Sequence, residues 1–92
     1  MVQFKGKIFD HNVSFLIDPR ATLSYVSPNI VEKCNLQTVK FKKPWLLQLT
    51  KGEKRHVLAK VNNCPLEIAG QPLVADLNIL PLGSYDVLIG MD

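Results

Sequence analysis

Ninety-two residues leave room for one domain around one hydrophobic core, which excludes a bilobal enzyme that carries its whole active site. Hydrophobic residues make up 47% of the chain and charged residues 21%, a composition that excludes a disordered segment. The net charge of +3 is mildly basic, which permits a nucleic-acid partner without requiring one.

Missing motifs exclude several further classes of protein. Cys34 and Cys64 have neither a Cys-x-x-Cys nor a Cys/His ligand spacing, so we expect reduced thiols and no metal site. The sequence lacks a phosphate-binding glycine loop and a nucleophile elbow, and we expect no cofactor. No apolar run approaches the roughly 20 residues of a membrane span, and the N-terminus has no signal-peptide core. We therefore expect an intracellular, cytoplasmic protein with no membrane partner.

Apolar and polar residues alternate from the start of the chain, where Val2, Phe4 and Ile8 are separated by polar residues and glycine. A period of two is typical of half-buried strands. A turn is expected at residues 10–12. The pattern and the turn residues between the apolar runs predict strands at residues 2–9, 13–17, 45–49, 57–61, 64–68, 73–80 and 85–89. The last of these runs is apolar on both faces from Val87 onward, which predicts a central place in the sheet.

One short helix interrupts the strands. Ser27 followed by Pro28 is typical of an N-cap and first helical turn, and the helix is expected to run to about residue 34, with Asn35 at its end. Residues 24–27 are expected to be extended or irregular. The sequence therefore predicts an all-β domain, closed or sandwich-like, with one short helix.

The carboxylate of Asp18 stands at a distinctive position. The apolar run at residues 15–17 brings it to the point where Pro19 stops the strand and turns the backbone. An aspartate before proline can open a turn, with its side chain bonded to backbone amides one or two residues on. It can also be a catalytic group, and these residues alone leave both interpretations open. A second apolar run, at residues 85–92, again ends in a glycine and an acid.

Together these stretches resemble a known family. The Asp-x-x-Ala-Thr pattern at residues 18–22, the polar hairpin at residues 50–55 and Asp-Val-Leu-Ile-Gly-Met-Asp at residues 86–92 are similar to the retropepsin-like aspartic protease domain of gypsy-type LTR retrotransposon polyproteins. The resemblance covers nearly the whole chain. It implies a single domain, residues 1–92, folded as a closed retropepsin-like barrel that forms one half of a homodimeric aspartic protease.

The resemblance also implies roles for individual residues. Asp18 would be the catalytic acid, and the two Asp18 carboxylates of a homodimer would share one proton and activate a water to hydrolyse peptide bonds in the polyprotein. Ile89 and Gly90 would pack behind the catalytic loop, and Thr22 would contact the backbone of the polypeptide substrate. The other implied site residues are Pro19, Arg20 and Ala21 in the catalytic loop, and Lys51, Gly52 and Glu53 in a flap that closes over the substrate.

Two residues depart from the Asp-Thr-Gly or Asp-Ser-Gly loop of the family. Pro19 has neither a hydroxyl nor an amide hydrogen, so hydrogen bonds of about 1 kcal/mol each across the dimer would be lost. Arg20 replaces glycine, and a side chain forced into a positive φ would cost about 1–2 kcal/mol. Its guanidinium would favour the ionised form of Asp18, unless it points outward. Residues 1–92 also lack the helix and dimer strand that follow in the family, and we expect impaired activity.

Two alternative functions remain open. The domain could be an inactive relic that keeps the fold and acts as an interaction module. It could also be a small basic nucleic-acid-binding β domain, although only Phe41 and Trp45 supply stacking faces. The charge for that function would come from Lys40, Lys42, Lys43, Lys51, Lys54 and Arg55. We interpret the lysines at residues 40–43 as a solvated strand edge, and we expect no nucleic-acid partner.

Overall fold

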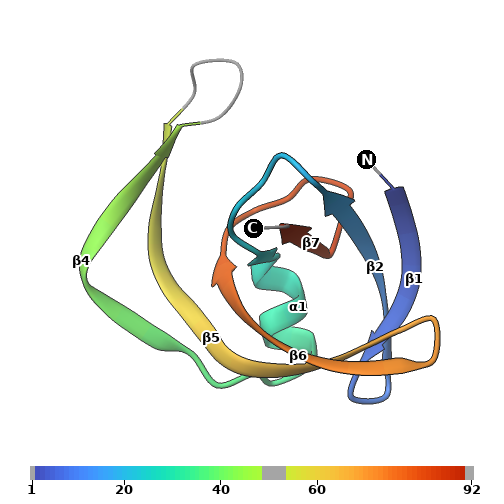
Figure 1. Ribbon diagram of the computed structural model, residues 1–92. Helices are drawn as coiled ribbons and strands as arrows, with labels where there is room; N and C mark the ends of the chain where they lie inside the picture. Colours follow the sequence, from blue (N-terminus) through green and yellow to red (C-terminus); the bar gives the residue numbers. More distant parts are fainter. Residues whose placement is uncertain (1, 49–53, 91–92) are drawn as a thin grey trace.

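The computed structural model describes residues 2–48 and 54–90 of the chain (Figure 1). Its strands are β1 (Val2–Ile8), β2 (His11–Asp18), β3 (Tyr25–Val26), β4 (Val39–Gln48), β5 (Lys54–Ile68), β6 (Gln71–Ile79) and β7 (Val87–Gly90), and the helix α1 (Pro28–Lys33) lies between β3 and β4 in the chain. The strands form one mixed sheet in the order β1-β2-β7-β3-β6-β5-β4.

The sheet closes on itself at β1. This strand pairs with β2 along its length and also with β5, through Gly6 opposite Ile68 and Lys7 opposite Glu67. The second pairing joins the described strands into a ring, with β4 outside it on β5 (Figure 1). Gly6 allows the close approach, because a Cβ there would collide with the Glu67 carbonyl oxygen and lie 2.6 Å from Phe15 Cε2. The closed all-β barrel with one short helix, predicted from the sequence, is confirmed.

The ring encloses the main hydrophobic core. Phe15, Ile8 and Leu77 are fully buried there, and Ile30 of α1 packs against the same core. The predicted central place of the last apolar run is confirmed, because β7 lies between β2 and β3 and Val87 is fully buried.

A second, smaller cluster joins the β4–β5 hairpin to the ring. Tyr25, Val57 and Leu80 are buried in it, and Trp45 and Leu88 pack against them. The hairpin is therefore held at its base by side chains of β3 and β7 rather than by sheet pairing alone.

The predicted boundaries of α1 agree with the structure. Ser27 is the N-cap, and its Oγ accepts a hydrogen bond from the Asn29 amide at 3.3 Å. Asn35 adopts a positive φ of 52° after the helix, and the Leu36 amide donates to the Val31 carbonyl at 3.0 Å, which closes the last turn. No helix in the described part of the chain is long and apolar enough to cross a membrane.

Several strand boundaries differ from the prediction. The runs at 57–61 and 64–68 are one strand, β5, because a bulge between Val61 and Cys64 absorbs the polar pair that separates them. Asn63 in the bulge has a φ of 52°, and its amide donates to Asp76 Oδ1 at 2.8 Å. β4 begins six residues before its predicted start and includes the lysine-rich segment, with an irregularity between Lys40 and Trp45.

Two further differences lie near the start of the chain. His11 and residue 12 belong to β2 rather than to a turn, because the backbone reverses one residue earlier, at Phe9, which has a φ of 54°. Tyr25 and Val26, expected to be extended or irregular, pair with β6 on one side and β7 on the other.

Candidate active site

Asp18 is the last residue of β2 and lies beside Gly90, the last residue of β7, in a parallel pairing. The strand before it is fixed on both sides, by β1 and by β7, and Phe15 and Leu16 are buried. The Asp18 side chain is half-buried, whereas Pro19 is exposed. The fold thus places one carboxylate at the edge of the barrel, at the end of a strand that is paired on both sides.

The backbone after Asp18 folds back as a tight turn. The Ala21 amide donates to the Asp18 carbonyl oxygen at 3.1 Å, and the Arg20 amide donates to Asp18 Oδ1 at 2.9 Å. The turn-forming role of an aspartate before proline is therefore present here. The same hydrogen bond orients the carboxylate, so the turn-forming and catalytic interpretations are compatible.

Arg20 sits in this turn without the backbone strain that was expected of it. It is not among the described residues with a positive φ, so replacing glycine brings no left-handed conformation, and that part of the prediction is wrong. Residue 20 contacts Asp18 through its backbone amide, a group that every residue except proline provides. Its exposed side chain extends from the turn on the solvent side.

Gly90 lies directly behind the loop. A Cβ on Gly90 would overlap the Leu23 carbonyl oxygen, and would lie 2.7 Å from the Ala21 carbonyl oxygen and 2.9 Å from the Leu23 amide nitrogen. Only glycine permits this approach of two backbones. Ile89 is half-buried against the main core and pairs with Ile17, while Thr22 in the loop is exposed.

Sequence reasoning missed two residues that hold the far end of the loop. Ser24 Oγ accepts a hydrogen bond from the Gly90 amide at 3.1 Å. The Ser24 carbonyl oxygen accepts from both the backbone amide and the side-chain Nδ2 of Asn78, at 2.9 and 3.2 Å. The available signal was Asn78 itself, an amide between the apolar residues Leu77 and Ile79. These bonds tie the loop to β7 and β6, so both of its ends are positioned by the barrel.

The predicted flap residues Lys51, Gly52 and Glu53 lie outside the described residues. The strands that flank them are described: β4 and β5 pair as far as Gln48 opposite Lys54. This hairpin projects from the ring (Figure 1).

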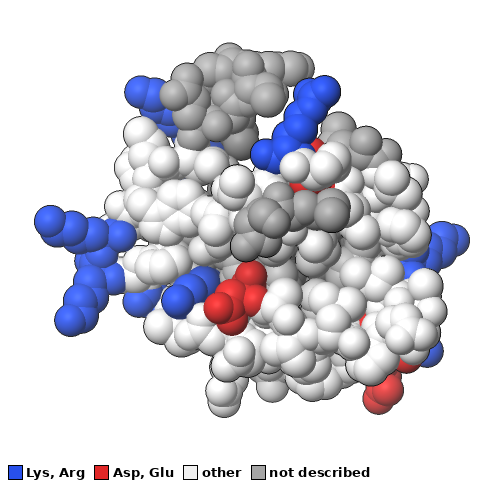
Figure 2. Space-filling view, viewed as in Figure 1, with Lys and Arg blue, Asp and Glu red and all other residues white. Residues whose placement is uncertain are grey.

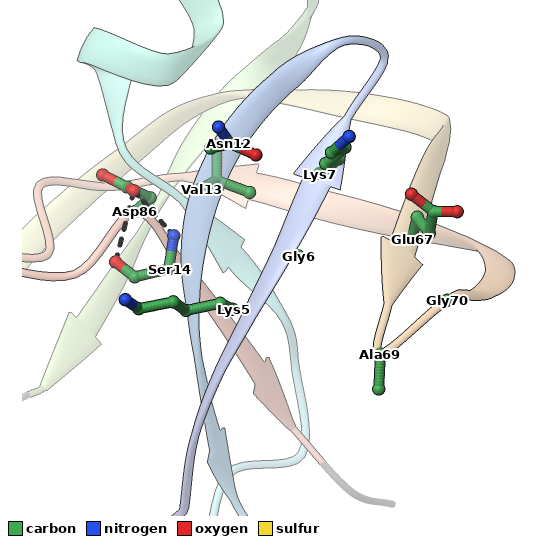
Figure 3. Close-up of a pocket in the computed structure, with 10 residues that line it drawn as sticks. All are labelled: Lys5, Gly6, Lys7, Asn12, Val13, Ser14, Glu67, Ala69, Gly70 and Asp86. Carbon is green, nitrogen blue, oxygen red and sulfur yellow. Dashed lines mark hydrogen bonds between the residues drawn. The ribbon is translucent and has the colours of Figure 1, made fainter.

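Asp86, in the second motif, accepts hydrogen bonds from two other segments of the chain. Its Oδ2 accepts from the Ser14 amide at 2.8 Å and from the Ser14 hydroxyl at 3.2 Å, and its carbonyl oxygen accepts from the Ser27 amide at 2.9 Å. It borders a hollow of about 590 Å³ on β1, β2 and the β5–β6 turn, which Lys5 and Glu67 also line (Figure 3). Ser14 precedes Asp18 by four residues, about 13 Å along a strand, so this hollow is separate from the Asp18 loop.

Other ionisable groups are buried away from the loop. Burial raises the pKa of the Cys64 thiol to about 11, and it also raises the pKa values of Cys34 and Tyr25. Within residues 2–48 and 54–90, no three His, Cys, Asp or Glu side chains gather closely enough to hold a metal ion. At the loop that follows β2, the described residues offer one oriented carboxylate per chain, that of Asp18.

Comparisons with known proteins show which family and which fold this chain has. Residues 1–92 match the sequence model of the family described as retroviral aspartyl protease. A comparison with curated proteins found no match. Among solved structures, the retroviral protease-like domain of Ddi1 from Leishmania major is similar, with a TM-score of 0.71 at 17% identity over 98% of this chain and 71% of that chain. That likeness shows a retropepsin-like fold, and the match along every residue shows that the chain belongs to the retroviral aspartyl protease family.

Proposed function

We propose that this domain is the aspartic endopeptidase of a retrotransposon polyprotein and that it acts as a homodimer. The observation that carries the proposal is the position of Asp18, at the end of a strand paired on both sides and with Gly90 packed behind its loop. This arrangement of Asp18 and Gly90 occurs in a chain that matches the retroviral aspartyl protease family over its whole length.

The chemistry requires two copies of the chain. One carboxylate must act as a base toward the attacking water while another polarises or protonates the scissile carbonyl. Two carboxylates close together share one proton, because they cannot both ionise cheaply. Each chain supplies one Asp18 and hydrogen-bonds it to the Arg20 amide at 2.9 Å. A homodimer therefore completes the site, with the polypeptide substrate between the loops and the β4–β5 hairpin.

We propose further that activity is weak with Pro19 and Arg20 in the loop. Pro19 supplies no hydroxyl and no amide hydrogen to bond the partner's loop. The Arg20 side chains of two subunits would bring like charges together where the loops meet, and like charges at short range repel. The hydrogen bond to Asp18 itself needs only the amide of residue 20, so glycine at this position would keep the bond and remove the repulsion.

The test is cleavage of apolar-rich peptides at mildly acidic pH. Arg20→Gly is expected to raise kcat/KM by at least about tenfold, which corresponds to about 1.4 kcal/mol of barrier. Arg20→Lys keeps the charge and bulk and serves as the matched control, with no gain expected. Adding Asp18→Asn to Arg20→Gly is expected to abolish cleavage. Equal rates for the wild type and Arg20→Gly would show that Arg20 does no harm, and cleavage with Asp18→Asn would refute the site.

A second candidate function follows from the same two substitutions. Pro19 and Arg20 together favour an inactive relic that uses the barrel as an interaction module. Sedimentation separates the two functions: an endopeptidase must dimerise, at least as Arg20→Gly, whereas a chain that neither dimerises nor cleaves in any variant supports the relic.

A further inference from the structure

The β4–β5 hairpin carries most of the positive charge of the protein. Residues 40–60 hold seven of the eleven basic residues and one of the eight acidic ones, a formal charge of +6. The remaining four basic and seven acidic residues give the rest of the chain −3. Basic side chains gather on the side of the molecule where β4 lies (left in Figure 2). This separation of charge within one small domain favours an acidic partner at the hairpin.

A groove of about 570 Å³ lies between this hairpin and the ring. Leu58, Ala59 and Pro44 line it from the hairpin, and Ile79 and Pro81 line it from the end of β6 and the segment after it. Leu58 is 57% exposed although it is a large apolar residue. Because neighbouring residues of a strand point to opposite faces, Leu58 lies on the other face from Val57, which is buried in the second cluster with Tyr25 and Leu80.

Basic residues border this apolar groove. Lys40 and His56 line it directly, and the Lys60 Nζ lies 5.7 Å from the ring centroid of Phe41, another lining residue. Lysines on an exposed edge strand discourage sheet-to-sheet pairing, and this role explains the lysines on β4. The same role does not explain Lys60, because β5 is paired on both sides, with β4 and β6. Positive charge therefore lies beside the groove on the central strand β5 as well as on the edge strand β4.

We infer that this groove binds an extended acidic segment of a partner protein. Apolar side chains of the segment would pack against Leu58 and Pro81, and its carboxylates would face Lys40 and Lys60. Such a peptide matches both properties of the surface, its apolar lining and its cationic border. The site does not involve Asp18, so the inference is independent of the proposed endopeptidase function.

The groove suits a peptide better than its main alternatives. Single-stranded nucleic acid needs open aromatic faces on which bases can stack. Phe41 and Trp45 instead pack edge to face, with ring centroids 6.2 Å apart, in the cluster that holds the hairpin, and Lys60 lies over the Phe41 ring. A second copy of the hairpin would bring +6 against +6, which is repulsive.

The test is fluorescence anisotropy of a labelled Glu-Leu-Glu-Pro-Leu-Glu peptide added to the purified chain, with the same peptide carrying Gln in place of Glu as the neutral probe. Lys40→Glu and Leu58→Ser are each expected to weaken binding of the acidic peptide by about tenfold, or about 1.4 kcal/mol. The matched controls are Lys33→Glu on α1 and Val74→Ser, another exposed apolar residue, on β6. Neither control is expected to change the affinity.

Each outcome decides the inference. Binding that weakens with added salt and with Lys40→Glu and Leu58→Ser, but not with the two controls, supports it. Equal binding of the acidic and neutral peptides, equal effects of test and control variants, or absence of binding overturns it. Tighter binding of an oligothymidylate that is insensitive to Leu58→Ser also overturns it, in favour of a nucleic-acid surface.

Discussion

Replacing Gly90 with alanine tests how closely the barrel supports the Asp18 loop. The added Cβ would overlap the Leu23 carbonyl oxygen and lie 2.7 Å from the Ala21 carbonyl oxygen and 2.9 Å from the Leu23 amide nitrogen. Ordinary van der Waals contact begins at 3.4 Å, so relieving the Ala21 contact alone requires a separation of about 0.7 Å, and the Leu23 carbonyl oxygen, which lies closer still, requires the loop and β7 to separate further. All three neighbours are backbone atoms, which cannot rotate aside as a side chain would.

Whether Gly90→Ala raises or lowers the free energy of unfolding depends on two opposed effects, the reduced freedom of the unfolded chain and the collision in the folded one. The backbone at Gly90 has no positive φ, so without the collision alanine would stabilise the fold by about 0.4–1 kcal/mol through the unfolded state. Overpacking against a fixed backbone costs about 1–3 kcal/mol. The shift also weakens the hydrogen bond from the Gly90 amide to Ser24 Oγ at 3.1 Å. We therefore expect Gly90→Ala to lower the free energy of unfolding by about 1–2 kcal/mol.

Urea unfolding measures the stability, and amide chemical shifts measure where the backbone moves. In Gly90→Ala the shifts should change at Asp18, Arg20 and Ser24. Gly83→Ala is the control: a Cβ there meets no atom within 4 Å, so its cost is limited to the positive φ of 68°, and the Asp18 loop should be unaffected. A Gly90→Ala protein as stable as the wild type, with an unchanged loop, would refute the packing argument.

Two further predictions concern stability. Asp76→Ala removes the acceptor of the Asn63 amide in the β5 bulge and should lower the free energy of unfolding by about 1 kcal/mol. Glu32→Ala, at another exposed carboxylate, is the control, and an unchanged stability of Asp76→Ala would show that the bulge does not need this hydrogen bond. Burial raises the pKa of Cys64 from 9.0 to about 11, so the unfolded chain releases this proton first as pH rises. The contribution of the protonated thiol is complete below pH 9.0 and is lost as pH rises through about 11, so urea midpoints should fall more steeply across that range in the wild type than in Cys64→Ala. Identical pH dependence in the two proteins would contradict the assignment of that loss to Cys64.

The class of fold was predictable because its signals are local. Alternating apolar residues, the Ser27 and Pro28 start of α1, and the apolar run that ends in Asp18 each reflect the preferences of a few consecutive residues. The same is true of the central place of β7, which its two apolar faces indicated. The resemblance to an aspartic protease domain came from the same short stretches, and the match over residues 1–92 supports the family.

Tertiary structure alone decided how distant segments meet. The closure of the ring depends on Gly6 approaching Glu67, and the support of the Asp18 loop depends on Ser24 receiving hydrogen bonds from Gly90 and Asn78. These residues carry no local signal of their partners, because each contact joins segments more than 50 residues apart. The positive φ expected at Arg20 was wrong for the same reason. The shape of the turn is set by the strands on both sides and not by the residue type at the position where the family has glycine.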